Sequence, residues 1–105
     1  MQPPPVKNDQ PECWPSLMKR MLKGSPLLPL MQARHELGIE RYGVGLQPHN
    51  GRDAVQDALE EALDLLVYLE QSRLENPKEH WQGACQTAVL DVAIKLQYVY
   101  NRRKA

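Results

Sequence analysis

The sequence has no phenylalanine, only two cysteines and no excess of charge of either sign. Its 13 basic side chains balance 13 acidic ones, so it lacks the surplus of Lys and Arg with which proteins bind long nucleic acid. No apolar run approaches the roughly 18 residues of a membrane span. The N-terminal residues also lack the basic and then apolar order of a signal peptide. We therefore expect a soluble, cytoplasmic protein that binds neither a membrane nor long nucleic acid.

Motifs of several other protein classes are missing as well. Cys13 and Cys85 lie far apart and match no metal-binding or redox spacing, which predicts reduced thiols. The pair His35-Glu36 begins like the His-Glu-x-x-His helix of zinc proteases, but position 39 is Ile, so the second histidine ligand is absent. No Gly-Lys-Ser or Gly-Lys-Thr occurs, which excludes a P-loop.

Prolines divide the 105 residues into two parts. Residues 1–24 form a Pro-rich N-terminal part: its first 11 residues are predicted to be extended and loosely held, and a short helix should run from about Pro15 to Lys23. Residues 25–105 form the predicted helical domain. Because so small a domain buries a limited core, we expect it to be completed by self-association into a dimer or tetramer.

Two of the longer helices are defined mainly by their ends and their periodicity. Ser25 as N-cap and Pro26 as the first helical residue predict a helix that ends near Tyr42. Residues 43–52 contain Gly, Pro and an Asn-Gly pair and should form a loop. A last helix is expected over about residues 79–103 because apolar residues recur there at helical spacing. These residues are Cys85, Ala88, Val89, Val92, Leu96 and Val99.

The helix between them has the clearest pattern. Asp53 followed by Gln56 is a capping-box pattern that starts it, and Asn76-Pro77 should end it near Glu75. Its apolar residues gather on one face, which we predict to be buried. They are Val55, Leu59, Ala62, Leu66 and Leu69. With no segment that alternates like a strand, the predicted fold class is all-α, a small four-helix bundle.

Four carboxylates share the opposite face of that helix, and Tyr68 continues their row one turn further on. They are Asp57, Glu60, Glu61 and Asp64. No Lys or Arg occurs between Arg52 and Arg73, although the chain is neutral overall. A solvated face usually mixes charges, because like charges one turn apart repel by a few tenths of a kcal/mol. The row is therefore either a solvated acidic face or a set of metal ligands.

A second pair of carboxylates lies on the preceding helix. Glu36 and Glu40 are four residues apart and so face the same way. If the two helices pack antiparallel, this pair converges with the acidic row, and such oxygen ligands suit Mg²⁺ or Mn²⁺. The alternative is that Glu36 and Glu40 form surface ion pairs with Arg34 or Arg41.

The residues at this point resemble a known family, the all-α nucleotide pyrophosphohydrolases of the MazG type. The stretch from Glu60 to Tyr68, Glu-Glu-Ala-Leu-Asp-Leu-Leu-Val-Tyr, is similar to the family's second metal motif, Glu-x-x-Asp. The stretches Arg-Tyr-Gly at 41–43, Leu-Gln-Pro at 46–48 and Asn-Gly-Arg-Asp at 50–53 resemble short phage-encoded members, including the MazZ-like subgroup. The resemblance covers about residues 31–73 well and the last helix loosely.

The resemblance implies a metal-dependent nucleoside triphosphate pyrophosphohydrolase in the cytoplasm, the host's if a phage encodes it. Such an enzyme converts a (d)NTP to (d)NMP and pyrophosphate, with dGTP or another purine dNTP as the expected substrate. A related enzyme that acts on dUTP or dCTP stays open. So does a non-catalytic helical interaction or regulatory module whose acidic face binds a basic partner.

The resemblance also suggests roles for individual residues. The expected ligands of Mg²⁺ or Mn²⁺ are Glu36, Glu40, Glu61 and Asp64. The first motif here, Glu36-x-x-x-Glu40, is one residue longer than the family's Glu-x-x-Glu, so either Glu36 alone or both glutamates bind the metal. Glu36 or Glu60 would accept the proton of the attacking water, which places Glu36, Glu60 and Glu61 in the catalytic centre.

The last helix supplies the expected phosphate contacts. Lys95, Tyr98 and Arg102 fall on one face of that helix, with Asn101 nearby. Lys95 and Arg102 would bind phosphate, and we assign all four residues to the substrate site. The alternative for Arg102 is that, with Arg103 and Lys104, it forms a basic helix end that the helix dipole favours.

Overall fold

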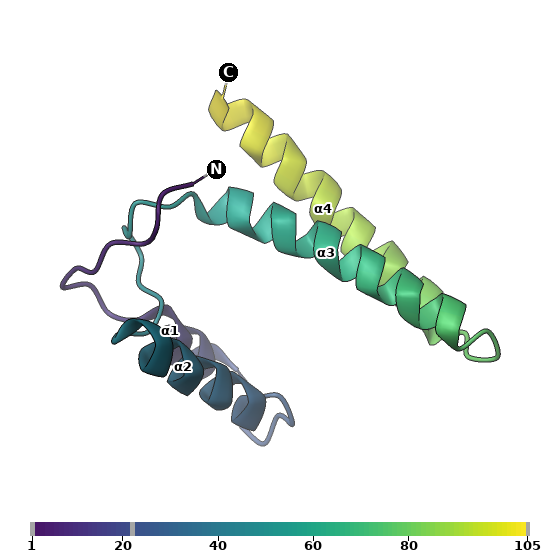
Figure 1. Cartoon of the computed structure of the whole chain (residues 1–105), viewed down its shortest axis with the longest axis horizontal. Helices are drawn as coiled ribbons and strands as arrows, with labels where there is room; N and C mark the ends of the chain where they lie inside the picture. Colours follow the sequence, from purple (N-terminus) through teal and green to yellow (C-terminus); the bar gives the residue numbers. More distant parts are fainter. Residues whose placement is uncertain (1, 22, 105) are drawn as a thin grey trace. The chain divides into compact units, whose positions relative to one another are not determined.

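The computed structural model describes residues 2–21 and 23–104 (Figure 1). Within these residues the chain forms four helices and no strand, which confirms the all-α prediction. The helices are α1 (Cys13–Arg20), α2 (Leu28–Tyr42), α3 (Ala54–Glu75) and α4 (Trp81–Lys104). None of these helices combines the length and the hydropathy that a membrane span needs.

The chain divides into two compact units. The N-terminal unit, Met1–Arg52, contains α1 and α2, and the C-terminal unit, Asp53–Ala105, contains α3 and α4. The proline content predicts a boundary after residue 24. This position lies inside the first unit, between α1 and α2, and the domain boundary there stays a prediction.

The C-terminal unit is a hairpin of two long helices that lie side by side and run in opposite directions (Figure 1). All five apolar residues predicted to form the buried face of α3 are half-buried or buried, and Ala62 is the buried one. The less exposed residues of α4 recur three or four positions apart, as expected for a helix packed along one stripe. They are Gln82, Gln86, Val89, Ala93, Leu96, Val99 and Tyr100.

This stripe corrects part of the sequence-based pattern for α4. Cys85, Ala88 and Val92 share the helical spacing but are exposed. The packed stripe includes two glutamines instead, because α3 offers them polar partners. Gln82 is completely buried, and its Nε2 donates to Ser72 Oγ at 3.1 Å. Apolarity alone therefore did not identify the face that packs.

The start of α3 matches its prediction. Asp53 Oδ1 accepts hydrogen bonds from the N–H groups of Val55 at 2.9 Å and Gln56 at 3.3 Å, so Asp53 is the N-cap. The amide of Gln56 donates to Glu60 at 3.2 Å, one turn further along. The predicted aspartate cap is confirmed, and the Gln56 side chain is hydrogen-bonded to Glu60 of the acidic row.

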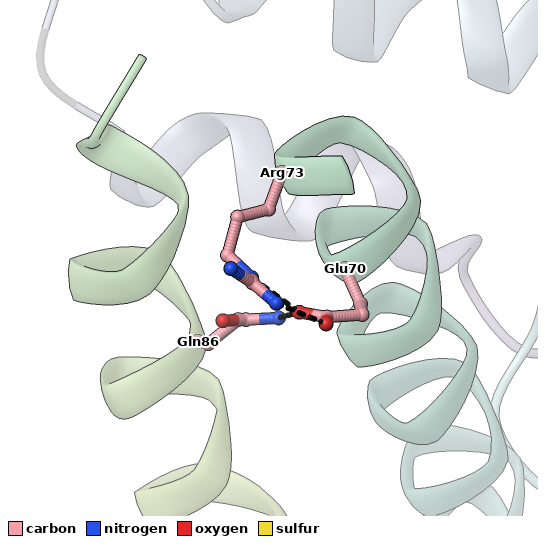
Figure 2. A network of polar contacts seen from close by, with 3 residues as sticks. All are labelled: Glu70, Arg73 and Gln86. Atoms are coloured by element: carbon pink, nitrogen blue, oxygen red, sulfur yellow. Dashed lines mark hydrogen bonds and ion pairs between the residues drawn. The ribbon is translucent and has the colours of Figure 1, made fainter. Parts of the chain in front are cut away.

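A polar network links the two helices near the end of α3 (Figure 2). The Arg73 guanidinium donates two hydrogen bonds to the Glu70 carboxylate, at 2.9 and 2.7 Å, and Gln86 on α4 donates a third at 3.2 Å. The hydrogen bonds from Arg73 and then from Gln86 lower the pKa of Glu70 from 4.5 to about 2. The ionised form of Glu70 is therefore part of the folded hairpin.

Replacing Glu70 by Gln should make the stability of the hairpin less sensitive to acid. Because the folded-state pKa of Glu70 is lowered to about 2, its contribution is present above about pH 4.5 and is lost as the pH falls towards 2. Urea unfolding followed by CD at a series of pH values measures this. We expect wild type to exceed Glu70→Gln at pH 7 and to lose that advantage on acidification. A difference that stays constant down to pH 2 would contradict the network's role.

The N-terminal unit departs from prediction at its helix ends. Helix α2 starts at Leu28 instead of Pro26, although Ser25 Oγ does accept a hydrogen bond from Leu27 N–H at 3.3 Å. A helix capped by Ser25 would need residue 29 to donate to the Ser25 carbonyl, and Pro29 has no N–H. The predicted end near Tyr42 is confirmed, because Gly43 (φ +78°) terminates α2 in the left-handed conformation.

Helix α1 also differs from its predicted span. It runs from Cys13 to Arg20, earlier than the predicted stretch from about Pro15 to Lys23. The backbone turns extended at Met21, whose N–H donates to the carbonyl of Met18. Residue 22, which the predicted helix included, lies outside the described residues.

The N-terminal segment is extended, as predicted, but it is not loosely held. The buried amide of Gln47 donates to the carbonyls of Asn8 at 2.7 Å and Gln10 at 2.8 Å, and its oxygen accepts from Asn8 N–H at 3.2 Å. The Asn8 amide in turn donates to the carbonyls of Pro48 and His49. We call these bonds the Gln47 clamp. They join the segment before α1 to the loop after α2.

Gly45 lies where the same loop passes close to two side chains. Its N–H donates to the Glu12 carboxylate, and it is buried. A Cβ atom added at this position would overlap that carboxylate and the buried imidazole of His35. The carboxylate can rotate away, whereas the imidazole is enclosed.

Substituting Gly45 by Ala should therefore destabilise the N-terminal unit. Forcing an extra group into a filled site costs about 1–3 kcal/mol. Gly38→Ala is a matched control, because nothing lies within 4 Å of a Cβ added there and alanine favours a helix over glycine by up to about 1 kcal/mol. Urea unfolding should show a lower free energy of unfolding than wild type for Gly45→Ala and a higher one for Gly38→Ala. Equal stability of Gly45→Ala and wild type would refute the overlap.

Candidate functional site

Three of the four carboxylates in the acidic row of α3 are exposed, as the helical periodicity predicts, and Asp57 is half-buried. Glu60, Glu61 and Asp64 are solvent-exposed, and Tyr68 follows them with 63% of its surface accessible. Glu60 accepts the hydrogen bond from Gln56. Within residues 2–21 and 23–104, no Lys or Arg forms an ion pair with Glu60, Glu61 or Asp64. These three carboxylates repel one another at one-turn spacing and have no basic side chain to offset the repulsion.

The two carboxylates of α2 are exposed as well. Glu36 accepts a hydrogen bond from Gln32 Nε2 at 3.0 Å, one turn before it. Surface ion pairs of Glu36 and Glu40 with Arg34 or Arg41 do not form in the part of the chain that the structure describes. Their spacing gives the reason, since each Arg is one, two, five or six residues from each Glu. Only side chains three or four residues apart are neighbours on a helix.

The two sets of carboxylates belong to different units. Glu36 and Glu40 lie in the N-terminal unit, whereas Glu61 and Asp64 lie in the C-terminal unit. Among the described residues, no three side chains of His, Cys, Asp or Glu come together as a group that would hold a metal ion. The predicted convergence of the two sets stays a prediction.

The donor chemistry of these residues nevertheless fits a hard divalent cation. All four predicted ligands present carboxylate oxygens, which Mg²⁺ and Mn²⁺ prefer. All four are also exposed, and none of them forms an ion pair in the described part of the chain.

The residues expected to contact phosphate lie on the exposed surface of α4. Lys95, Tyr98, Asn101 and Arg102 are all solvent-exposed. The Arg102 guanidinium lies over the Tyr98 ring, with 5.7 Å between its carbon and the ring centroid, and Nη1 is 3.5 Å from the Tyr98 hydroxyl. Arg102 thus has a partner one turn back, whereas Lys95 forms no ion pair or hydrogen bond among the described residues.

The N-terminal unit contains a cavity of about 630 Å³ that the sequence analysis did not predict. One wall is a single face of α2, and the loop after α2 and residues 4–7 form much of the rest. The α2 residues in this wall recur at i, i+3, i+4 and i+7, which identifies one helical face. They are Arg34, Leu37, Gly38 and Arg41.

The charge of this cavity is entirely basic. Lys7, Arg34, Arg41 and Arg52 line it, and the described lining residues include no Asp or Glu. Gln47, which ties residues 8–10 to the loop through the Gln47 clamp, is also one of its lining residues. Sequence reasoning missed the cavity because its lining extends from Pro4 to Arg52, which are 48 positions apart in the chain. The one local signal was an α2 face with two arginines and no carboxylate.

Comparison of the chain with family models, curated proteins and solved structures gives no match.

Glu60, Glu61 and Asp64, which form no ion pair in the described part of the chain, should make α3 less stable than its composition allows. Glu61→Gln removes the like-charge contact with Asp64, worth a few tenths of a kcal/mol at one-turn spacing. In EDTA at low salt, urea unfolding of Glu61→Gln should therefore show a stability slightly above that of wild type. Because salt screens exposed charges, the gain should shrink at 1 M NaCl. A loss of stability in EDTA would show that Glu61 has a structural partner.

Proposed function

We propose that the protein is a metal-dependent nucleoside triphosphate pyrophosphohydrolase that converts a (d)NTP to (d)NMP and pyrophosphate. The observation that carries the proposal is the presence, on α2 and on α3, of exposed carboxylates without basic partners in the described part of the chain. The resemblance of residues 31–73 to the MazG type adds support, and it makes dGTP or another purine dNTP the first substrate to test.

In this proposal Glu36, Glu40, Glu61 and Asp64 hold Mg²⁺ or Mn²⁺. The bound cation would supply charge neutralisation for the phosphate oxygens and a more acidic bound water. A general base must lie within reach of that water, and Glu60 or Glu36 would accept its proton. Glu60 suits this role because Gln56 already orients its carboxylate.

The reaction is a hydrolysis at the α-phosphorus. The oxygen of water forms a bond to that phosphorus, and the bond from phosphorus to the oxygen bridging to the β-phosphate breaks. The proton of water passes to the carboxylate base, and pyrophosphate leaves. On α4, Lys95 and Arg102, with Tyr98 and Asn101, would bind the negatively charged pyrophosphate that leaves.

Self-association into a dimer or tetramer is part of the proposal. Large apolar side chains remain exposed on both helices of the C-terminal unit, and apolar surface of this extent is typical of an interaction site. On α3 and α4 they include Leu63, Leu65, Val67, Leu74, Leu90, Val92 and Ile94. A cytoplasmic location, the host's if a phage encodes the chain, belongs to the same proposal.

A second candidate is a non-catalytic interaction module that uses the acidic row of α3 to bind a basic partner. The exposure of Glu60, Glu61 and Asp64 is compatible with it. The two candidates differ in their response to metal. A ligand at 100 times its Kd stabilises a protein by about 2.7 kcal/mol, so a metal site should give a thermal shift with millimolar Mn²⁺. An acidic docking face would respond mainly to salt.

The activity itself is tested with a substrate panel. Purified protein with Mg²⁺ or Mn²⁺ is incubated with each dNTP, dUTP included, and pyrophosphate and the monophosphate are measured. Glu61→Gln and Asp64→Asn should each lower turnover by at least about 100-fold, because loss of a metal-binding group removes transition-state stabilisation of about 2.7 kcal/mol or more. Their far-UV CD spectra should remain helical.

Glu75→Gln is the matched control. Glu75 also lies on α3, outside the acidic row, and accepts a hydrogen bond from Gln71. Its substitution should leave turnover unchanged. Full activity of both Glu61→Gln and Asp64→Asn would refute the assignment of the site, and no pyrophosphate from any nucleotide would refute the proposed reaction.

A further inference from the structure

We propose that the basic cavity of the N-terminal unit is a nucleotide-binding site, in which Lys7, Arg34 and Arg41 bind phosphate and Trp14 or Tyr42 stacks on the base. The identification of the ligand as a nucleotide rests in part on the proposed function. The site lies in a different unit from the phosphate contacts expected on α4.

The charges around the cavity carry the first step. Lys7, Arg34 and Arg41 line the cavity. Within the described residues, none of their three side chains forms an ion pair or a hydrogen bond. Cations gathered without anions repel one another, and a bound anion relieves that repulsion. The chain as a whole has no net charge, so this grouping does not follow from a basic composition. Guanidinium groups are well suited to phosphate, whose oxygens they bind in pairs.

The lining and the size carry the second step. Besides cations, the cavity is lined by the aromatic rings of Trp14, which is half-buried, and Tyr42, which is exposed. Aromatic side chains stack on nucleobases of any sequence, and positive charge beside them retains the phosphates. A volume of about 630 Å³ is within the usual range for small-molecule sites. A ligand with a flat ring and several negative charges matches both features, and a nucleoside phosphate is such a ligand.

Gly38 carries the third step. It lies in the interior of α2, where glycine is unfavourable for a helix, and on the cavity face between Arg34 and Arg41. A Cβ at this position would meet nothing within 4 Å, so packing does not require glycine there. The missing side chain leaves this part of the cavity wall open. A larger residue at 38 would occupy that space without changing any charge.

The test measures binding without turnover. Trp81, half-exposed on α4, is replaced by Phe so that Trp14 is the single tryptophan of the full-length protein. Its fluorescence is titrated in EDTA with dGTP, dATP, dUTP, inorganic triphosphate and deoxyguanosine. We expect a saturable change with a nucleoside triphosphate, at least about tenfold tighter than with inorganic triphosphate or the nucleoside alone. The affinity should fall as salt rises.

Two kinds of variant locate the site. Arg34→Gln combined with Arg41→Gln should weaken binding at least about tenfold. Lys19→Gln combined with Arg20→Gln removes the same charge from the end of α1, outside the cavity lining, and should have no comparable effect. Gly38→Leu should block binding sterically, whereas Gly83→Leu makes the same change in α4, where a Cβ also meets nothing within 4 Å, and should not. CD melting confirms that each variant folds, and Gly38→Leu keeps the test valid if the arginine pair is needed for folding.

The outcomes separate this inference from the proposed function. It is overturned by absence of binding in EDTA, by equal affinity for inorganic triphosphate, or by equal effects of the cavity variants and their controls, even if dNTPs are hydrolysed with Mg²⁺. Conversely, binding that the cavity variants weaken supports the site even if no nucleotide is hydrolysed, in which case the proposed reaction alone fails.

Discussion

The small amount of apolar surface that the chain buries is the constraint on which its other features depend. Among the described residues, the apolar side chains in the buried class are Ala62 and Ala93, one on each helix of the C-terminal hairpin. Alanines allow helices to approach closely but remove little apolar area from water. Polar contacts therefore have a large part in defining each unit. Gln82 is completely buried against Ser72, and Gln47 holds the N-terminal segment to the loop after α2.

The same shortage leaves many large apolar side chains exposed on α3 and α4. A chain of this size has a high ratio of surface to volume, so it has few ways to cover such residues by itself. Self-association would bury them and would supply the core that one copy lacks. The proposed oligomer thus follows from the same constraint as the polar packing inside each unit.

Helix α2 gives the two proposals a common physical basis. Its glutamates and its arginines are separated by spacings other than three or four residues, so they cannot neutralise each other along the helix. Glu36 and Glu40 form one exposed group, while Arg34 and Arg41 line the cavity. A nucleotide with its divalent cation carries both charges, and a helix that keeps its own charges on separate faces suits such a ligand. The proposed metal ligands and the proposed nucleotide site therefore depend on one local pattern.

Local interactions could be predicted from the sequence. The aspartate cap of α3, the left-handed Gly43 at the end of α2 and the exposed acidic row each depend on residues within about one helical turn of each other. The predicted start of α2 at Pro26 was wrong, because the missing N–H of Pro29 outweighed the capping signal of Ser25. The prediction of the packed face of α4 was only partly right, because polar partners on α3 determine which face of α4 packs against it.

The sequence by itself determined the four helices of the described residues, the Asp53 cap of α3 and the separation of charges on α2 and α3, since all of these arise from neighbours along one helix. Only the tertiary structure decided the Gln47 clamp, the close approach at Gly45 and the basic cavity. The hydrogen bonds of the clamp and of Gly45 join residues 33 to 41 positions apart, such as Glu12 with Gly45 and Asn8 with His49, and the cavity lining extends from Pro4 to Arg52. A periodic pattern holds no information about which distant segments meet, because that depends on how the whole unit packs.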